Sequence, residues 1–243
     1  MNAENITVIT PTTGKDSLFN LMQSILMQRN SVPVTHVLLW DDKREGKFSC
    51  GMKPEDLEKY IANPLWAAAH YAINNIILKG NRINGEATGS ALRAVGLMAA
   101  NTDMVTFADD DIMWDELHVQ SMLSVLKDNL WAFCKRRIWT ALDNGQYEYL
   151  GVDNFESVGE EAKTPYKMVD NNCLMFSRVM GVSAAPLYRE TKNYNDDRLF
   201  YDFLKNYAGE PGKTKQATIN QVCPAKLVEF FRQNCTKEPV VTA

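Results

Sequence analysis

The sequence predicts an α/β fold, with a mainly parallel central sheet flanked by helices and a mixed α+β second half. In the first half, short apolar runs of strand length alternate with segments of helical periodicity, which is the rhythm of βαβ units. In the second half, strand-like runs rich in aromatic residues follow one another. With 243 residues, 45% of them hydrophobic, the chain can bury a core. We expect a single domain over 1–243, with a first half at 1–112 and a second half at 113–243.

The first half opens with the apolar run Ile6–Ile9, a strand that ends in the turn Pro11–Gly14. Asp16 or Ser17 can then cap a helix, because the apolar residues at 18, 21, 25 and 26 recur at helical spacing. The other elements that we expect here are strands at 36–40, 73–78 and 104–108, a short helix from Pro54, and a helix at 91–100.

The sequence of the second half predicts a different order of strands and helices from that of the first half. We expect a helix starting near Asp115, strands at 130–142, 147–152 and 167–176, and helices at 196–207 and after Pro224. The segment 153–165 is polar and acidic and ends in proline, so we expect an exposed loop. No internal repeat or linker divides the chain.

Composition narrows the class of protein. The net charge of -4 and the pI near 5.5 argue against extended binding to a nucleic-acid backbone, which needs a basic surface. The five cysteines are widely spaced without a CxxC pair, which predicts neither a disulfide framework nor a zinc site. The first residues do not resemble a signal peptide, and no run approaches the roughly 18 apolar residues of a membrane span. We expect a cytoplasmic protein without a membrane span.

The most informative motif is the triplet Asp109-Asp110-Asp111, directly after the apolar run at 104–108. Three adjacent carboxylates at a strand end repel one another unless a cation neutralises them. Mg²⁺ and Mn²⁺ prefer oxygen ligands and commonly join one or two carboxylates to substrate phosphates. The triplet therefore indicates a metal–nucleotide site at the carboxyl end of a strand, with a solvated acidic loop as the structural alternative.

Other polar residues are weaker candidates. Asp41 and Asp42 end the second strand, where a carboxylate can accept hydrogen bonds from a ribose or a base, although a turn acid is the alternative. Arg93 lies on the helix before the fourth strand and could face a diphosphate, or be a surface charge. Asp196 and Asp197 begin a helix, where the helix dipole favours acids, and either could take a proton from a substrate hydroxyl.

The segment 12–17 (TTGKDS) has some features of a phosphate-binding loop. The Walker form requires a glycine at position 9 and a Ser or Thr at position 16, and these are Ile9 and Asp16. The segment is closer to the SGGKDS loop of the ATP pyrophosphatases, although two of its small residues are threonines here. A helix N-terminus after a strand is the structural alternative.

Taken in order, these motifs resemble the inverting glycosyltransferases of family 2, which have the GT-A fold of the nucleotide-diphospho-sugar transferase superfamily. The resemblance covers roughly residues 5–210. Ala94 stands where the family's helix motif usually has Asn. The segments that carry the resemblance are Ile6–Thr12, Ser24–Gln28, Leu38–Asp42, Gly89–Gly96, Phe107–Asp111, Asp170–Phe176 and Asn195–Phe200.

The resemblance implies a nucleotide-sugar donor, with a UDP-sugar favoured, and a glycan or other hydroxyl-bearing acceptor. It implies Mn²⁺ or Mg²⁺ bound by Asp109 and Asp111, and a catalytic base at Asp196, or at Asp197 if the motif is displaced by one residue. It also implies that the first half of the chain binds the donor and the second half the acceptor. The residues implied to contact the donor are Pro11, Thr12, Thr13, Asp41, Asp42, Arg93, Asp109 and Asp110.

Two other functions remain open at this point. An ATP pyrophosphatase or nucleotidyltransferase would use residues 12–17 rather than the aspartates, and a non-catalytic nucleotide-sugar-binding module would not need Asp196. In an enzyme, the loop 153–165 and the segment after Gly209 are expected to order over the bound donor and exclude water.

Overall fold

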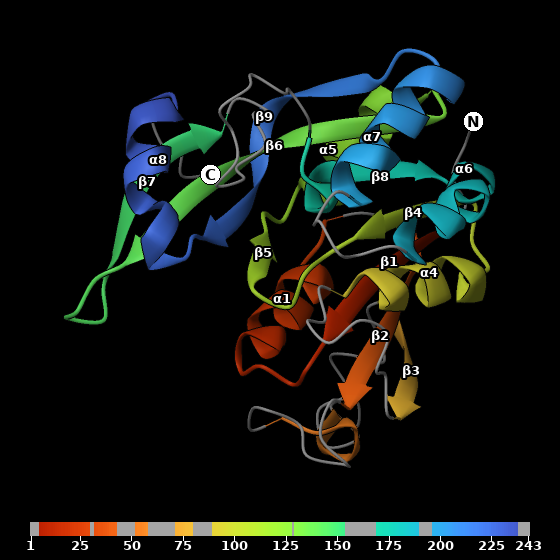
Figure 1. Cartoon of the computed structure of the whole chain (residues 1–243), viewed down its shortest axis with the longest axis horizontal. Coiled ribbons are helices and arrows are strands. Elements are labelled where there is room, and N and C mark those ends of the chain that lie inside the picture. Colours follow the sequence, from red (N-terminus) through yellow and green to blue (C-terminus); the bar gives the residue numbers. More distant parts are fainter. Residues whose placement is uncertain are drawn as a thin grey trace.

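The computed structural model describes residues 5–29, 32–42, 52–57, 71–79, 89–127, 129–153, 169–189 and 196–237. These residues form one nine-stranded sheet with helices packed against it (Figure 1). The α/β fold predicted from the sequence is confirmed. Of the predicted loop at 153–165, Asp153 is the last residue of a strand, and residues 154–165 lie outside the described residues.

The first half of the chain builds the parallel part of the sheet. Its elements are β1 (Ile6–Thr12), α1 (Ser17–Leu26), β2 (Val34–Asp42), the 3-10 turn η1 (Pro54–Asp56), β3 (Tyr71–Lys79), α4 (Ser90–Ala99) and β4 (Met104–Phe107). The four strands lie in the order β3-β2-β1-β4, and every neighbouring pair is parallel. Each strand and helix expected in this half is present, to within a few residues at its ends.

The second half builds the mixed part. Its elements are β5 (Ile112–Trp114), α5 (His118–Leu126), β6 (Trp131–Ala141), β7 (Tyr147–Asp153), η2 (Asn171–Cys173), β8 (Leu174–Ser177), α6 (Arg178–Ala184), η3 (Ala185–Arg189), α7 (Asp196–Tyr207), β9 (Gly212–Val222), η4 (Ala225–Leu227) and α8 (Val228–Asn234). Beyond β4 the sheet continues as β8-β6-β9-β5, and β7 pairs with β6. Strand β8 is antiparallel to both of its neighbours, whereas β9 is parallel to β6.

Two expectations for the second half are wrong. Of the predicted strand over 167–176, residues 167 and 168 lie outside the described residues, and the described part becomes a strand only at Leu174. The Asp170 side chain accepts a hydrogen bond from the Asn172 N–H and turns the chain into η2. The expectation of a lid after Gly209 is wrong for residues 212–222, which form β9 inside the sheet, and residues 238–243 lie outside the described residues. This strand is mostly polar, so its sequence lacks the apolar alternation that predicts a strand.

A continuous apolar core joins both halves and includes Ile9, Leu39, Phe107 and Phe176, all essentially inaccessible to solvent. Helix α4 lies close to this core because Gly96 faces β1 and β2. A Cβ at this position would lie 2.4 Å from Ile9 Cγ2 and 2.8 Å from Leu39 Cδ1. No helix in the described part of the chain is both long and apolar enough to cross a membrane.

Candidate active site

A cavity of about 270 Å³ opens at the carboxyl ends of the parallel strands. This edge is where open α/β sheets bind ligands. The walls come from the end of β1 and its turn, the end of β2, the start of α4 and the segment after β4. The lining residues are Pro11, Thr12, Thr13, Lys15, Asp41, Gly89, Leu92, Arg93, Asp109, Asp110 and Asp111.

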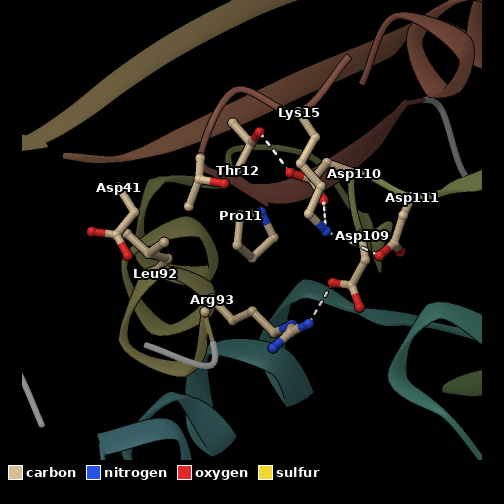
Figure 2. Close-up of a pocket in the computed structure, with 11 residues that line it drawn as sticks. Pro11, Thr12, Lys15, Asp41, Leu92, Arg93, Asp109, Asp110 and Asp111 are labelled. Atoms are coloured by element: carbon tan, nitrogen blue, oxygen red, sulfur yellow. Dashed lines mark hydrogen bonds and ion pairs between the residues drawn. The ribbon is translucent and has the colours of Figure 1, made fainter. Parts of the chain in front are cut away.

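The cavity has two chemically different ends. In Figure 2, Asp41 lies on one side of Pro11 and the aspartate triplet lies on the other, with Lys15 and Arg93 beside the triplet. One end therefore offers a single buried carboxylate, and the other concentrates charged groups of both signs. Such a division suits an elongated ligand with a hydrogen-bonding group at one end and phosphates at the other.

Lys15 and Thr12 hold the second and third aspartates. The Lys15 ammonium lies 2.8 Å from Asp110 Oδ1 and 3.0 Å from Asp111 Oδ2. The Thr12 hydroxyl donates to Asp110 Oδ2 at 2.8 Å and accepts from the Gly14 N–H at 2.9 Å. Burial alone would lower the pKa of Lys15, but the hydrogen bond and charge of Asp110, together with Asp111, raise it above its ordinary value. Lys15 is therefore a cation held in place beside the triplet.

Asp109 faces the opposite way, toward Arg93 on α4 and Asn172 in η2. One of its carboxylate oxygens accepts a hydrogen bond from the Arg93 guanidinium, and the other accepts from Asn172 Nδ2 at 3.0 Å. Arg93 is buried, with its guanidinium 5.8 Å from the centre of the Phe107 ring. Burial alone would lower the pKa of Arg93, and the charges of Asp109 and Asp197 raise it. Two cations thus accompany the three carboxylates of the triplet at this end of the cavity.

The triplet suits a divalent cation that shares its coordination with a phosphate. Within the described part of the chain, no three His, Cys, Asp or Glu side chains converge as a complete ligand set. Mg²⁺ and Mn²⁺ do not require one, because in nucleotide sites one or two carboxylates act together with substrate oxygens. The Asp111 side chain is 44% exposed and can reach such a cation. Burial, followed by the charge of Asp109, raises the pKa of Asp111.

The start of α7 places two neighbouring acids differently, and neither is part of the cavity wall formed by the described residues. The Asp196 carboxyl is buried and accepts a hydrogen bond from the Ser90 hydroxyl at the start of α4. Asp197 is only partly buried and accepts from Asn171 Nδ2 at 2.5 Å. Burial raises the pKa of Asp197 to about 7; the charge of Arg93 opposes this rise, and the charges of Asp170, Asp109 and Asp196 add to it.

Most of the residues predicted from the sequence come together. Seven of the eight predicted donor contacts line the cavity, together with Asp111, and Asp42 is the last residue of β2. Lys15, Gly89 and Leu92 also line it but are not among the predicted residues. The Gly-Lys pair at 14–15 is the signal for Lys15. Gly89 has a φ of 76° and leaves room for Pro11, whose Cβ would lie 3.0 Å from an added Cβ.

The structure of the chain is similar to those of TarS from S. aureus. TarS 1–349 in complex with UDP aligns with a TM-score of 0.60 and 14% identity, over 96% of this chain and 67% of that chain. TarS 1–349 in complex with UDP-GlcNAc aligns with a TM-score of 0.58 and 14% identity, over 90% of this chain and 59% of that chain. A longer TarS chain gives 0.56 and 14%, over 96% and 40%. This chain therefore spans 40% to 67% of the length of these TarS chains.

No protein-family model and no curated protein matches the sequence. At 14% identity the likeness to TarS concerns the fold alone. Together with the sheet order and the position of the cavity, it shows that this chain has a GT-A-like fold.

Proposed function

We propose that this chain is an inverting glycosyltransferase of the family 2 type. It transfers a sugar, in our proposal a hexose, from a nucleotide-diphosphate sugar to the hydroxyl of a glycan or another acceptor. A UDP-sugar is the favoured donor, because TarS, which has the same fold, forms complexes with UDP and UDP-GlcNAc. We place the protein in the cytoplasm, in keeping with the free thiols of all four cysteines in the described residues.

The observation that carries the proposal is the division of the cavity into two ends. Asp41 can accept hydrogen bonds from the ribose or base of a nucleoside. A diphosphate at the other end would meet the cations of Arg93 and Lys15. When the bond from the sugar to the phosphate breaks, negative charge grows on the leaving diphosphate, and fixed positive groups lower the energy of that transition state.

We propose that a divalent metal, Mn²⁺ or Mg²⁺, binds with the donor at Asp111 and Asp109. Bound there, it would supply a Lewis acid for the leaving diphosphate. The chain's part is to present the oxygens of Asp111 and to keep Lys15 beside them. Because Lys15 pairs with both Asp110 and Asp111, a metal at Asp111 would share that carboxylate with the Lys15 ammonium.

We assign the role of general base to Asp197, with Asp196 as its structural neighbour. A base must reach solvent and substrate, and Asp197 is only partly buried whereas Asp196 is 3% exposed. With a pKa near 7, the carboxylate can take a proton from an acceptor hydroxyl close to neutral pH. The deprotonated oxygen would attack the anomeric carbon opposite the leaving diphosphate, so a single displacement inverts that centre.

Calorimetry with UDP, GDP, TDP and ATP, each with Mn²⁺ and again with EDTA, tests the proposal. We expect UDP with Mn²⁺ to bind most tightly. Tightest binding of ATP, with loss of binding in Lys15→Met but not in Asp111→Asn, would favour an ATP pyrophosphatase or nucleotidyltransferase instead.

The transfer itself can be followed without knowing the acceptor, by the release of UDP from UDP-sugars into water or onto mixed glycans. An α-linked donor should first yield the β anomer, which proton NMR detects. Retention of the α configuration would rule out the single displacement. Donor binding without any UDP release would instead indicate a non-catalytic nucleotide-sugar-binding module.

A further inference from the structure

A short turn before β8 contacts both sides of the candidate site. The asparagine turn, Asp170–Asn172, consists of one acid followed by two asparagines. The two asparagine side chains are almost completely buried, with 1% and 2% exposure. The Asp170 carboxylate accepts from the backbone N–H of Asn172 at 2.9 Å and from its Nδ2 at 2.8 Å. Hydrogen bonds within the turn therefore hold it closed, independently of its contacts with the rest of the protein.

Asn172 binds the first aspartate of the triplet from two directions. Its Oδ1 accepts a hydrogen bond from the backbone N–H of Asp109 at 2.7 Å, and its Nδ2 donates to Asp109 Oδ2 at 3.0 Å. The same carboxylate receives the Arg93 guanidinium on its other oxygen. Asn172 therefore sets both the backbone position and the carboxylate orientation of Asp109 at the phosphate end of the cavity.

Asn171, the preceding residue, binds the candidate base. Its Nδ2 donates to Asp197 Oδ1 at 2.5 Å, across 26 residues of sequence. Successive residues of one turn thus hold an acid of the donor pocket and an acid of α7. Because the turn is short and hydrogen-bonded to itself, a shift of one asparagine would also move the other.

Arg136 anchors the turn from the opposite side. This guanidinium is buried on β6 and lies 2.5 Å from Asp170 Oδ2 and 2.8 Å from Asp153 Oδ2. It also donates to Gln221 on β9 at 2.6 Å. A buried charge with three partners has a well-defined position, since losing any of them would leave polar groups unsatisfied. The mixed part of the sheet therefore fixes where the asparagine turn stands.

We propose that the asparagine turn is a positioning element, which sets the distance between the donor diphosphate and the base. Asn172 acts through Asp109 and governs donor binding. Asn171 acts through Asp197 and governs the rate of transfer. This division of roles rests on the proposed glycosyltransferase function and adds two positioning residues to it.

Two single variants separate the roles. Asn172→Ala should raise the Kd of UDP with Mn²⁺ about 10- to 100-fold, the usual effect of losing a residue that orients a ligand. Asn171→Ala should leave this Kd within about twofold and lower kcat by about 10- to 100-fold. Asn129→Ala is the matched control, because that side chain donates one hydrogen bond to Val125 O at the end of α5 and touches no cavity residue in the described part of the chain.

Combining variants tests whether Asn171 acts through Asp197. In an Asp197→Asn background, Asn171→Ala should lower kcat no further, whereas a purely structural effect would add to the loss. Asn171→Asp keeps the side-chain shape and replaces the donor with an acceptor, so it gives the same test if the alanine variant does not fold. Unchanged turnover in both Asn171 variants would overturn the proposal. So would equal effects of the two alanine variants on Kd and kcat.

The contact can also be tested without a substrate. A thermal-unfolding cycle of Asn171→Ala with Asp197→Asn should show coupling between the two residues. Strictly additive destabilisation would overturn the positioning role, whatever the reaction. Donor binding without transfer by the wild-type protein would instead count against the proposed function, and so the two failures are distinguishable.

Discussion

The parallel and mixed halves of the sheet contribute to the candidate site in different ways. In the parallel half, β1, β2 and β4 run in the same direction, so the residues that follow them meet at one edge. In the mixed half, Asp197 and Asn171 meet through a turn and a helix start that belong to no repeated unit. The comparison teaches that the donor side follows from topology, whereas the base side depends on individual long-range contacts.

The largest effect is expected from a variant that removes the chemistry of the mixed half and leaves the parallel half intact. Asp197→Asn keeps the size of the side chain but cannot take a proton, so kcat should fall about 10²- to 10⁴-fold while UDP affinity is retained. Rates of UDP release and calorimetry measure the two quantities.

The neighbour Asp196→Asn is the control, because its amide oxygen can still accept the Ser90 hydrogen bond. We expect transfer within about tenfold of wild type. If Asp196→Asn is inactive and Asp197→Asn is active, the general base is Asp196. Wild-type rates in both would leave the mixed half without a chemical role.

The second effect lies in the parallel half. Replacing Mn²⁺ with EDTA should weaken UDP binding by about 100-fold, because interactions with charged groups contribute about 1.5–3 kcal/mol each and the metal makes several. The triplet should repel a bare diphosphate and attract its metal complex. Calorimetry checks this, with Asp111→Asn as the matched variant. Equal UDP affinity with and without metal would remove the triplet from this role.

The third effect concerns the other end of the cavity. Asp41→Ala should weaken UDP binding by about 1–3 kcal/mol, the usual result of losing hydrogen bonds to a ribose or base. Calorimetry measures the affinity, and thermal unfolding confirms that the protein folds. A variant with wild-type affinity would identify Asp41 as a residue of the turn only.

The smallest effect is on stability. The folded pKa of Asp197, about 7, lies above the value of about 4 for an unfolded aspartate. The folded state therefore holds this proton more tightly, and its stability falls as the pH rises through this interval. The Tm of Asp197→Asn, relative to wild type, should increase by about 5–10 °C between pH 5 and pH 8. A pH-independent difference would mean that the carboxyl titrates normally.

The sequence predicts the parallel half well because its signals are local. Apolar runs of four or five residues, each followed by polar residues, locate β1, β2 and β4 and thereby the residues at their ends. In contrast, β9 is polar and is recognised as a strand only through its pairing with β6 and β5. The asparagine turn interrupts a run that otherwise suggests a strand. The role of this turn depends on its contacts with Asp109 and Asp197, which lie 63 and 26 residues away from Asn172 and Asn171, respectively.

The family pattern favours Asp196 as the base, or Asp197 if the motif is displaced by one residue, and three-dimensional contacts distinguish these two acids. Asp196 faces Ser90, and Asp197 faces Asn171. The role of Lys15 is similarly ambiguous in the sequence, because a Gly-Lys pair suggests a phosphate loop. In the structure its partners are Asp110 and Asp111, which lie about a hundred residues away in the sequence.

Lys15 and Arg93 make the aspartate triplet compatible with folding in the absence of a metal. A structural metal site typically contributes much of a domain's folding free energy, so a chelator unfolds the protein. Here the chain carries two counter-ions of its own, each placed against a different carboxylate. The pocket can therefore fold at whatever metal concentration the cell provides. A divalent ion would bind together with the ligand rather than complete the fold.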